Sequence, residues 1–322
     1  MAALDIPFRA AGAGLAPARP IELPAIWVDG SALDQALAAC GGAHESRSGD
    51  LTFRFPVGCK VMIDSAVRLL SLLNQLDNCT RRAVLEFDEG EAGVMGYLDR
   101  MGFFDCLSPN VGVHPYRPAV SAADAYRGRN PGLVEIAAIG TQVRDQELPN
   151  RLTSVLVEAC SDRQDVEALG GAAWLIFAEL VDNIYSHSQT RLDGFAALQV
   201  YPRGNGLKVA VSDSGLGIMA TLRPSLQSQH PSLSRLSDLD LLVEIFREGV
   251  SRHGSQRGCG LKGAAAKAVK FSAELEVRLP QIRVQLTPSL SGYRRSTARC
   301  FQGLPLIWGT HICFSFRLDS PV

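Results

Sequence analysis

Residues 195–217 have the sequence FAALQVYPRGNGLKVAVSDSGLG, and they decide the fold of the second half of the chain. We expect two strands, 195–201 and 207–213, joined by a hairpin, because both positions of Asn205-Gly206 tolerate positive φ. One face of the second strand is shared by residues of the same parity, namely Leu207, Val209, Val211 and Asp213. A carboxylate therefore points into the layer that holds the core, where it needs hydrogen-bond partners.

Helices precede this hairpin, and a run of strands ends the chain. The predicted helices of the second half cover 148–160, 165–187, 238–249 and 261–270. A polar Ser/Leu-rich loop is expected between the hairpin and the third of these helices. Besides the hairpin, the predicted strands cover 133–139, 273–279, 282–286, 294–301 and 310–318. Helices followed by antiparallel strands are typical of an α+β fold, here a two-layer α/β sandwich.

The first part of the chain predicts a separate, smaller α/β domain. Its expected strands and helices alternate over 51–55, 61–76, 83–87 and 92–101. The segment before Ile21 is rich in Ala, Gly and Pro, and Pro and Gly are dense again between Pro109 and Pro131. We therefore divide the chain into a flexible tail (1–20), a small α/β domain (21–120), a linker (121–147) and a larger domain (148–322).

Composition and charge narrow the class of protein. The 322 residues are 46% apolar and 20% charged, with a net charge of −1, which is ordinary for a globular chain of about two domains. That balance gives no electrostatic footprint for nucleic acid or a membrane surface, and no apolar run approaches the ~18 residues of a membrane span. The eight cysteines are scattered and form no C-x-x-C, which favours reduced thiols in a cytoplasmic protein.

Two polar residues mark the helix expected over 165–187. Glu179 and Asn183 lie four residues apart and therefore on the same face. They fall at the edge of the apolar stripe, where a carboxylate and an amide can face a cleft beside the core. A metal or water site and a solvated helix flank both fit this placement.

Glycines follow Asp213 and recur before a later helix. Gly215 and Gly217 would let the backbone approach a flat or charged ligand, and a buried acceptor beside them suits a purine amino group; a capping aspartate is the alternative. The run GCGLKG, residues 258–263, would place the free amides of a helix N-terminus on an anion, unless it is a flexible loop. Its Lys262 either contacts a phosphate or is solvated.

A Gly-Thr pair, Gly309-Thr310, opens the last predicted strand. Taken in order, ELVDN on a helix, DSGLG after the hairpin, GCGLKG before a helix and this GT pair resemble the motifs of the GHKL ATP-binding superfamily. That superfamily includes gyrase, a heat-shock chaperone, the histidine-kinase catalytic domain and MutL. The match covers about residues 150–318 and implies a Bergerat-type ATP-binding fold, like the histidine-kinase ATPase domain, for 148–322.

The resemblance implies a role for each residue. Asn183 would coordinate a Mg²⁺ ion on the phosphates, and Glu179 would act as general base on water or on an acceptor hydroxyl. Asp213 would accept a hydrogen bond from the adenine amino group, with Thr310 supporting it through water. Residues 219–257 would form a lid that closes on ATP. The remaining residues implied to bind the nucleotide are Gly215, Gly217, Gly258, Gly260 and Lys262.

The first domain is more loosely similar to the STAS fold of anti-sigma antagonists, on the order of a strand over 83–87, a short loop and a helix over 92–101. In that family the loop often carries a phosphorylatable serine. Here the loop, Asp88 to Glu91, has no hydroxyl, which argues against such a switch. No long phosphoacceptor helix precedes the second domain, so a complete two-component kinase is not expected.

Three functions are compatible with these residues. The first is an active Mg-ATPase or a protein kinase of serine or histidine type, regulated by the first domain. The second is a non-catalytic, ATP-dependent switch that recruits a protein partner, and the third is a scaffold that binds no nucleotide. The glycines and Asp213 argue against the scaffold. ATP and Mg²⁺ are the implied cofactors, and the sequence leaves open which protein is the partner and whether the chain forms a homodimer.

Overall fold

A seven-stranded sheet forms the centre of the molecule, with the strand order β12-β11-β10-β13-β9-β8-β7 and antiparallel pairing throughout. It is seen in a computed structural model that describes residues 20–46, 50–140, 145–187, 189–248, 259–289 and 292–319. The strands are β7 (Leu133–Ile139), β8 (Gly194–Tyr201), β9 (Gly206–Ser212), β10 (Glu274–Leu279), β11 (Ile282–Leu286), β12 (Ala298–Phe301) and β13 (His311–Arg317). The strands predicted for the second half are therefore confirmed.

The β8–β9 hairpin has the expected pairing but a longer turn. Tyr201 pairs with Gly206 across it. The positive φ falls on Asn205, at 48°, after a 3₁₀ turn over Pro202–Gly204. The parity argument holds, because Leu207, Val209 and Val211 lie in the same buried cluster as the helices, whereas Ala210 lies in a second cluster.

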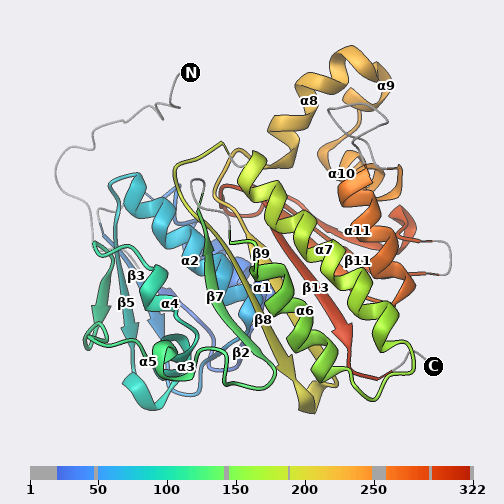
Figure 1. Ribbon diagram of the computed structural model, residues 1–322. Coiled ribbons are helices and arrows are strands. Elements are labelled where there is room, and N and C mark those ends of the chain that lie inside the picture. Colours follow the sequence, from blue (N-terminus) through green and yellow to red (C-terminus); the bar gives the residue numbers. More distant parts are fainter. Residues whose placement is uncertain are drawn as a thin grey trace.

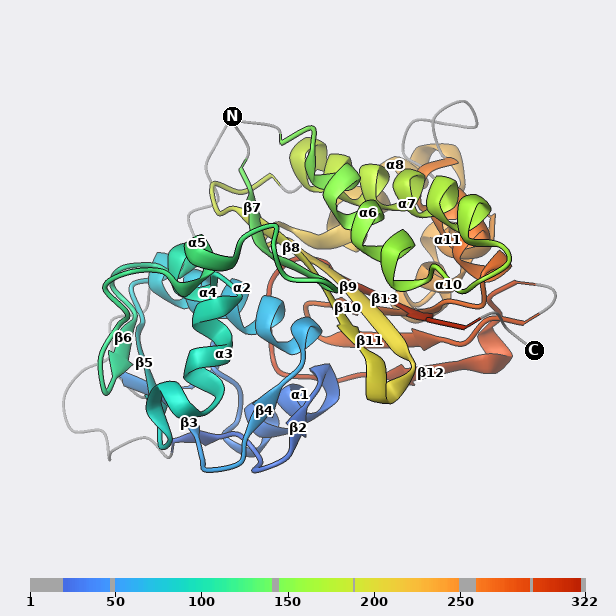
Figure 2. The ribbon, with the colours of Figure 1, turned by 60° about the horizontal axis from the view of Figure 1, so that its bottom comes forward.

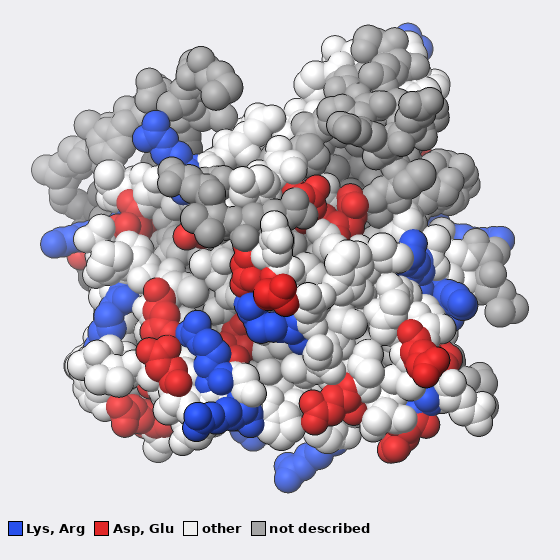
Figure 3. All heavy atoms as spheres, viewed as in Figure 1, with Lys and Arg blue, Asp and Glu red and all other residues white. Residues whose placement is uncertain are grey.

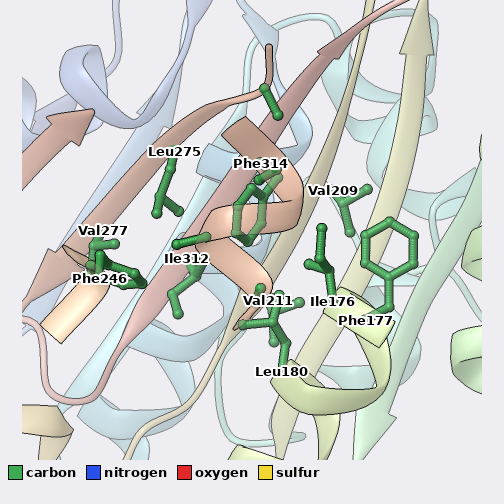
Figure 4. Packing of buried hydrophobic residues seen from close by; sticks show 14 of the residues in the cluster. Ile176, Phe177, Leu180, Val209, Val211, Phe246, Leu275, Val277, Ile312 and Phe314 are labelled. Carbon is green, nitrogen blue, oxygen red and sulfur yellow. The ribbon is translucent and has the colours of Figure 1, made fainter. Parts of the chain in front are cut away.

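Three helices cover the first face of this sheet: α6 (Leu148–Ala159), α7 (Val166–His187) and α11 (Cys259–Lys270) (Figure 1). The predicted apolar stripe of α7 is buried against the strands. Figure 4 shows Ile176 and Leu180 of α7 facing Val209 and Val211, with Phe314 of β13 beside them. This packing places α7 over β9, the strand that ends at Ser212 directly before Asp213.

The stretch expected as a polar loop is helical. Residues after the hairpin form α8 (Gly217–Gln229), α9 (Pro231–Ser234) and α10 (Asp238–Glu248). Leu222 and Leu226 are four residues apart, so one side of α8 is apolar and packs into the helix-covered core, which the Ser-rich composition concealed. Phe246 of α10 joins the same core beside Val277 (Figure 4). Within the implied lid, residues 249–257 lie outside the described part.

The N-terminal unit, residues 20–126, covers the second face of the large sheet (Figure 2). It holds a parallel sheet in the order β1-β3-β5-β6 and a two-stranded β2-β4 pair. The parallel strands are β1 (Ile21–Glu22), β3 (Asp50–Phe55), β5 (Arg82–Phe87) and β6 (Gly112–His114), and the pair is β2 (Trp27–Val28) with β4 (Lys60–Val61). Its helices are α1 (Gly30–Ala39), α2 (Ile63–Asn78), α3 (Val94–Arg100), α4 (Phe103–Cys106) and α5 (Ala122–Tyr126).

Helix α2 packs directly on β8 and β9. The large sheet is therefore covered on both faces, by α7 on one and by α2 on the other, in a mixed α/β fold. This arrangement confirms the mixture of helices and strands that the sequence predicted. The residues predicted as a linker also take part in the fold, since β7 lies within 121–147 and forms the sheet edge next to β8.

The distribution of charged side chains and the state of the cysteines can be compared with the expectations from composition. Acidic and basic side chains are interspersed over the face shown in Figure 3. Within the described ranges, no helix has the length and apolar character needed to cross a membrane. The seven cysteines whose side chains are described are all free thiols.

Candidate functional site

Asp213 follows β9 directly and is almost enclosed, with 9% of its surface exposed. Its carboxylate accepts a hydrogen bond from the Gly215 amide (2.7 Å) on one oxygen and from the Thr310 amide (3.2 Å) on the other. Its own amide donates to the Thr310 carbonyl (3.0 Å). Burial raises the pKa of Asp213 to about 6, although the Gly215 and Thr310 hydrogen bonds act in the opposite direction. The group is therefore a desolvated carboxylate that is still ionised at neutral pH.

Gly309 lets the start of β13 come this close to Asp213. Its φ is 97°, and a Cβ added there would lie 1.9 Å from the Asp213 carbonyl oxygen. Gly217, the first residue of α8, also has a positive φ of 79°. A Cβ added there would lie 3.2 Å from the Gly309 carbonyl oxygen. Sequence reasoning noted Gly309 only as the neighbour of Thr310. The sequence signal that could have identified Gly309 is its position immediately before a predicted strand, because a glycine there often allows another backbone segment to approach closely.

Thr310 ties β13 to the first turn of α8. Its hydroxyl oxygen accepts a hydrogen bond from the Ile218 amide (3.2 Å). Thr310 has the parity of Ile312, Phe314 and Phe316, which all lie in the helix-covered core. Asp213, Gly215, Gly217 and Thr310 are thus brought together by the structure at one end of the β9–β13 pair.

Glu179 and Asn183 are half-buried on α7 and bonded to each other. The Asn183 side-chain amide nitrogen donates to Glu179 Oε1 (3.1 Å). Burial raises the pKa of Glu179, an effect that the Asn183 hydrogen bond opposes and the neighbouring Asp182 supports. The next residue, Ile184, lies against Gly194, whose Cβ position is 2.6 Å from Ile184 Cγ2 and 2.9 Å from the Ser212 carbonyl oxygen. This part of α7 therefore lies over the end of β9 where Asp213 follows.

The glycine run before α11 is only partly described. Gly258 lies outside the described residues, and the side chain of Lys262 is not described either. Helix α11 begins at Cys259, two residues earlier than expected, so Gly260 belongs to its first turn. Helix α11 packs against α7. In the described ranges no group of three or more His, Cys, Asp or Glu side chains is placed to hold a metal ion.

The sequence analysis missed a polar interface behind this site. The face of β9, β10 and β13 that points away from α7 carries charged and polar residues, which alternation alone assigns to solvent. The structure buries them against the N-terminal unit instead. Asp34 of α1 accepts from Arg278 Nε (3.1 Å) and lies 3.2 Å from Arg283 Nη1, and Arg68 of α2 donates to Glu276 Oε1 (2.7 Å). Burial lowers the pKa of Arg278 to about 10, although Asp34 acts against this.

The acidic loop after β5 is held by its own neighbours. Both carboxylate oxygens of Asp88 accept from the Arg54 guanidinium at 3.2 Å. Glu89 accepts from the Gly58 amide (2.9 Å). The carboxylates at this position are therefore structural contacts of the N-terminal unit.

Comparison with known proteins adds no relative. No family model matches the chain, and a search of curated proteins finds no match. The functional argument therefore rests on the chain's own residues and their geometry.

Proposed function

We propose that the site around Asp213 binds ATP with Mg²⁺, in a Bergerat-type ATP-binding fold formed by the second half of the chain. The proposal is supported by a helix layer on an antiparallel sheet and by the placement of Asp213, Gly215, Gly217 and Thr310 at one end of that sheet. The function is that of a regulatory ATPase or protein kinase whose lid, residues 219–257, closes on the nucleotide.

The carboxylate of Asp213 is the observation that carries the proposal. It is buried, held from both sides by backbone amides, and has a pKa of about 6. A desolvated, ionised acceptor strongly favours a hydrogen-bond donor such as the adenine amino group. Guanine presents a carbonyl oxygen at the corresponding position, which a carboxylate repels. The site should therefore prefer ATP to GTP.

The residues on α7 fit a Mg²⁺ ion that arrives with the nucleotide. Because the Asn183 nitrogen is bonded to Glu179, its carbonyl oxygen is oriented away from that bond as the amide's cation-binding atom. One neutral oxygen suits an ion that keeps most of its waters and binds phosphate oxygens. When bound, Mg²⁺ would neutralise phosphate charge, while Asn183 holds it and Gly260 contributes an amide of the first turn of α11.

Glu179 is the residue that favours a catalytic function, ATP hydrolysis or phosphate transfer, over ATP binding without catalysis. Burial raises the pKa of this half-buried carboxylate, which makes it a better acceptor for a proton from water or from a hydroxyl. The alternative, a non-catalytic switch that recruits a protein partner, requires ATP binding but no role for this carboxylate. Turnover therefore separates the two functions.

Calorimetric titration of the full-length chain with ATP and with GTP, each with and without Mg²⁺, tests the proposal. We expect ATP binding that Mg²⁺ strengthens and weak binding of GTP. Phosphate release is then measured for the wild type, for Glu179→Gln and for Glu167→Gln, a matched change at an exposed position of the same helix. No binding of millimolar ATP would refute the proposal. ATP binding without phosphate release by the wild type would support the switch.

A further inference from the structure

One face of α2 runs along the polar face of β9 and ends at the candidate site. Three of its side chains contact β9 or the residues just after it, in the same order along both segments. In order along the helix the contacts are Asp64 with Lys208 (3.1 Å), Ser71 with Ser212 (2.7 Å) and Gln75 with Ser214 (3.0 Å). The last contact places a residue of the N-terminal unit next to Asp213.

Gln75 uses all of its hydrogen-bonding capacity at this point. Its side chain is 2% exposed. The amide nitrogen donates to Ser214 Oγ (3.0 Å) and to the Trp308 carbonyl (2.9 Å). The amide oxygen accepts from the Trp308 amide (3.0 Å) and contacts His44 Nε2 (3.2 Å). An amide has two donor hydrogens and two acceptor lone pairs, so each has a partner here.

The two segments that Gln75 joins are the two that surround the Asp213 carboxylate. Ser214 is the residue after Asp213, and Trp308 precedes the Gly309-Thr310 pair whose amide binds that carboxylate. One side chain from the N-terminal unit therefore connects both walls of the proposed base site.

A second route from α2 reaches the same wall. Ser71 contacts Ser212, and Ser212 contacts His311 Nδ1. The other ring nitrogen of His311 lies 3.1 Å from the Trp308 carbonyl, the group that also accepts from Gln75. Burial lowers the pKa of His311 well below its usual value, so the ring is neutral and donates to that carbonyl through Nε2.

We propose that Gln75 is a positioning residue for base recognition: it holds the segment 213–215 and the segment 308–310 at the spacing that admits adenine. Discrimination between ATP and GTP then depends on the docking of the N-terminal unit. This inference rests on the proposed binding of ATP at Asp213. Among the described residues, the hydrogen bonds of Gln75 go to His44, Ser214 and Trp308 and not to α7 or α11, so phosphate binding should not depend on it.

The test compares three ligands on the full-length chain: ATP, GTP and inorganic tripolyphosphate. Gln75→Met keeps the length of the side chain but removes every hydrogen bond, and Ser214→Ala removes one acceptor in case Gln75→Met does not fold. The matched control is Tyr97→Phe, which loses a different bond between the N-terminal unit and the sheet, from Tyr97 to Gln199 Oε1 (2.5 Å). Thermal unfolding of each variant reports the general loss of stability.

We expect Gln75→Met to weaken ATP binding about tenfold and to reduce the ATP-to-GTP ratio of affinities by about the same factor. Ser214→Ala should also lower ATP affinity and the ATP-to-GTP ratio of affinities, but by a smaller factor than Gln75→Met. Tripolyphosphate affinity should stay at the wild-type value, and Tyr97→Phe should keep the wild-type ratio even if it unfolds at a lower temperature.

Two results would overturn the inference about Gln75 while leaving the proposed ATP binding by the wild type intact. One is an unchanged affinity ratio in both Gln75→Met and Ser214→Ala. The other is an equal loss of ATP and tripolyphosphate affinity, which indicates general loosening. If the wild type binds no ATP, the proposed function and this inference both fail, and that outcome is visible before any variant is made.

Discussion

Replacing Asp213 with asparagine should change how stability depends on pH, as well as nucleotide binding. Burial raises the pKa of Asp213 from 3.8 to about 6. An aspartate whose pKa is higher in the folded state binds an extra proton on folding between these two pH values. Its contribution to stability is therefore fully present below pH 3.8 and is lost as the pH rises through about 6.

The size of this effect follows from the raised pKa. A change from 3.8 to about 6 corresponds to about 3 kcal/mol of unfolding free energy between acid and neutral solution. Asparagine does not titrate, so Asp213→Asn lacks this dependence. Other groups titrate in both proteins and cancel in the difference. The unfolding free energy of wild type minus that of Asp213→Asn should thus fall by about 3 kcal/mol from about pH 4 to about pH 8.

Urea unfolding of both proteins at several pH values measures this difference. Asp193→Asn, at an exposed position beside the start of β8, serves as the control for an aspartate-to-asparagine change at the surface. At neutral pH the variant should also lose ATP binding, because the adenine amino group would lose a charged acceptor worth about 1.5–3 kcal/mol and meet an amide donor.

Three outcomes would refute this reasoning. A difference that stays constant with pH would mean that Asp213 is not desolvated. A difference that grows with pH would mean that its anion is stabilised by folding, the reverse of the present argument. ATP affinity equal to that of the wild type would show that Asp213 does not recognise the base.

Four further substitutions test other parts of the site and its support. Glu179→Gln should keep ATP affinity and lower kcat by about 10²–10⁴, whereas Asn183→Ala should weaken Mg²⁺-dependent ATP binding; equal losses of affinity in calorimetry would place both side chains at the metal. Asp34→Asn should cost about 3–5 kcal/mol in urea unfolding, because buried arginines lose their carboxylate, and a loss under about 1 kcal/mol would contradict that burial. Gly309→Ala should lower the melting temperature and abolish ATP binding, since its Cβ would lie 1.9 Å from the Asp213 carbonyl oxygen; a variant with wild-type melting and binding would refute the close approach.

Much of the second half could be predicted from local pattern. The helices over α6, α7 and α10 and the strands from β8 to β13 follow the periods of their apolar residues. The parity rule predicted that Leu207, Val209 and Val211 share one face of β9, and their burial in one cluster confirms it. Local patterns succeed here because each element buries one apolar face, and the spacing of apolar residues within the element identifies that face. The α8 helix was missed because only two buried leucines mark it among serines.

The tertiary structure alone decided what lies behind the sheet. Alternation showed that Lys208, Ser212 and His311 lie on the polar side of their strands, and a polar side is usually taken to face water. Whether it does depends on charges placed far away in the chain, such as Asp64 on α2, which pairs with Lys208. The residues around Gln75 do not indicate its role either, because its partners Ser214 and Trp308 are 139 and 233 residues away in the sequence. A local pattern records how a residue faces its own element, whereas only the assembled fold determines which distant group satisfies it.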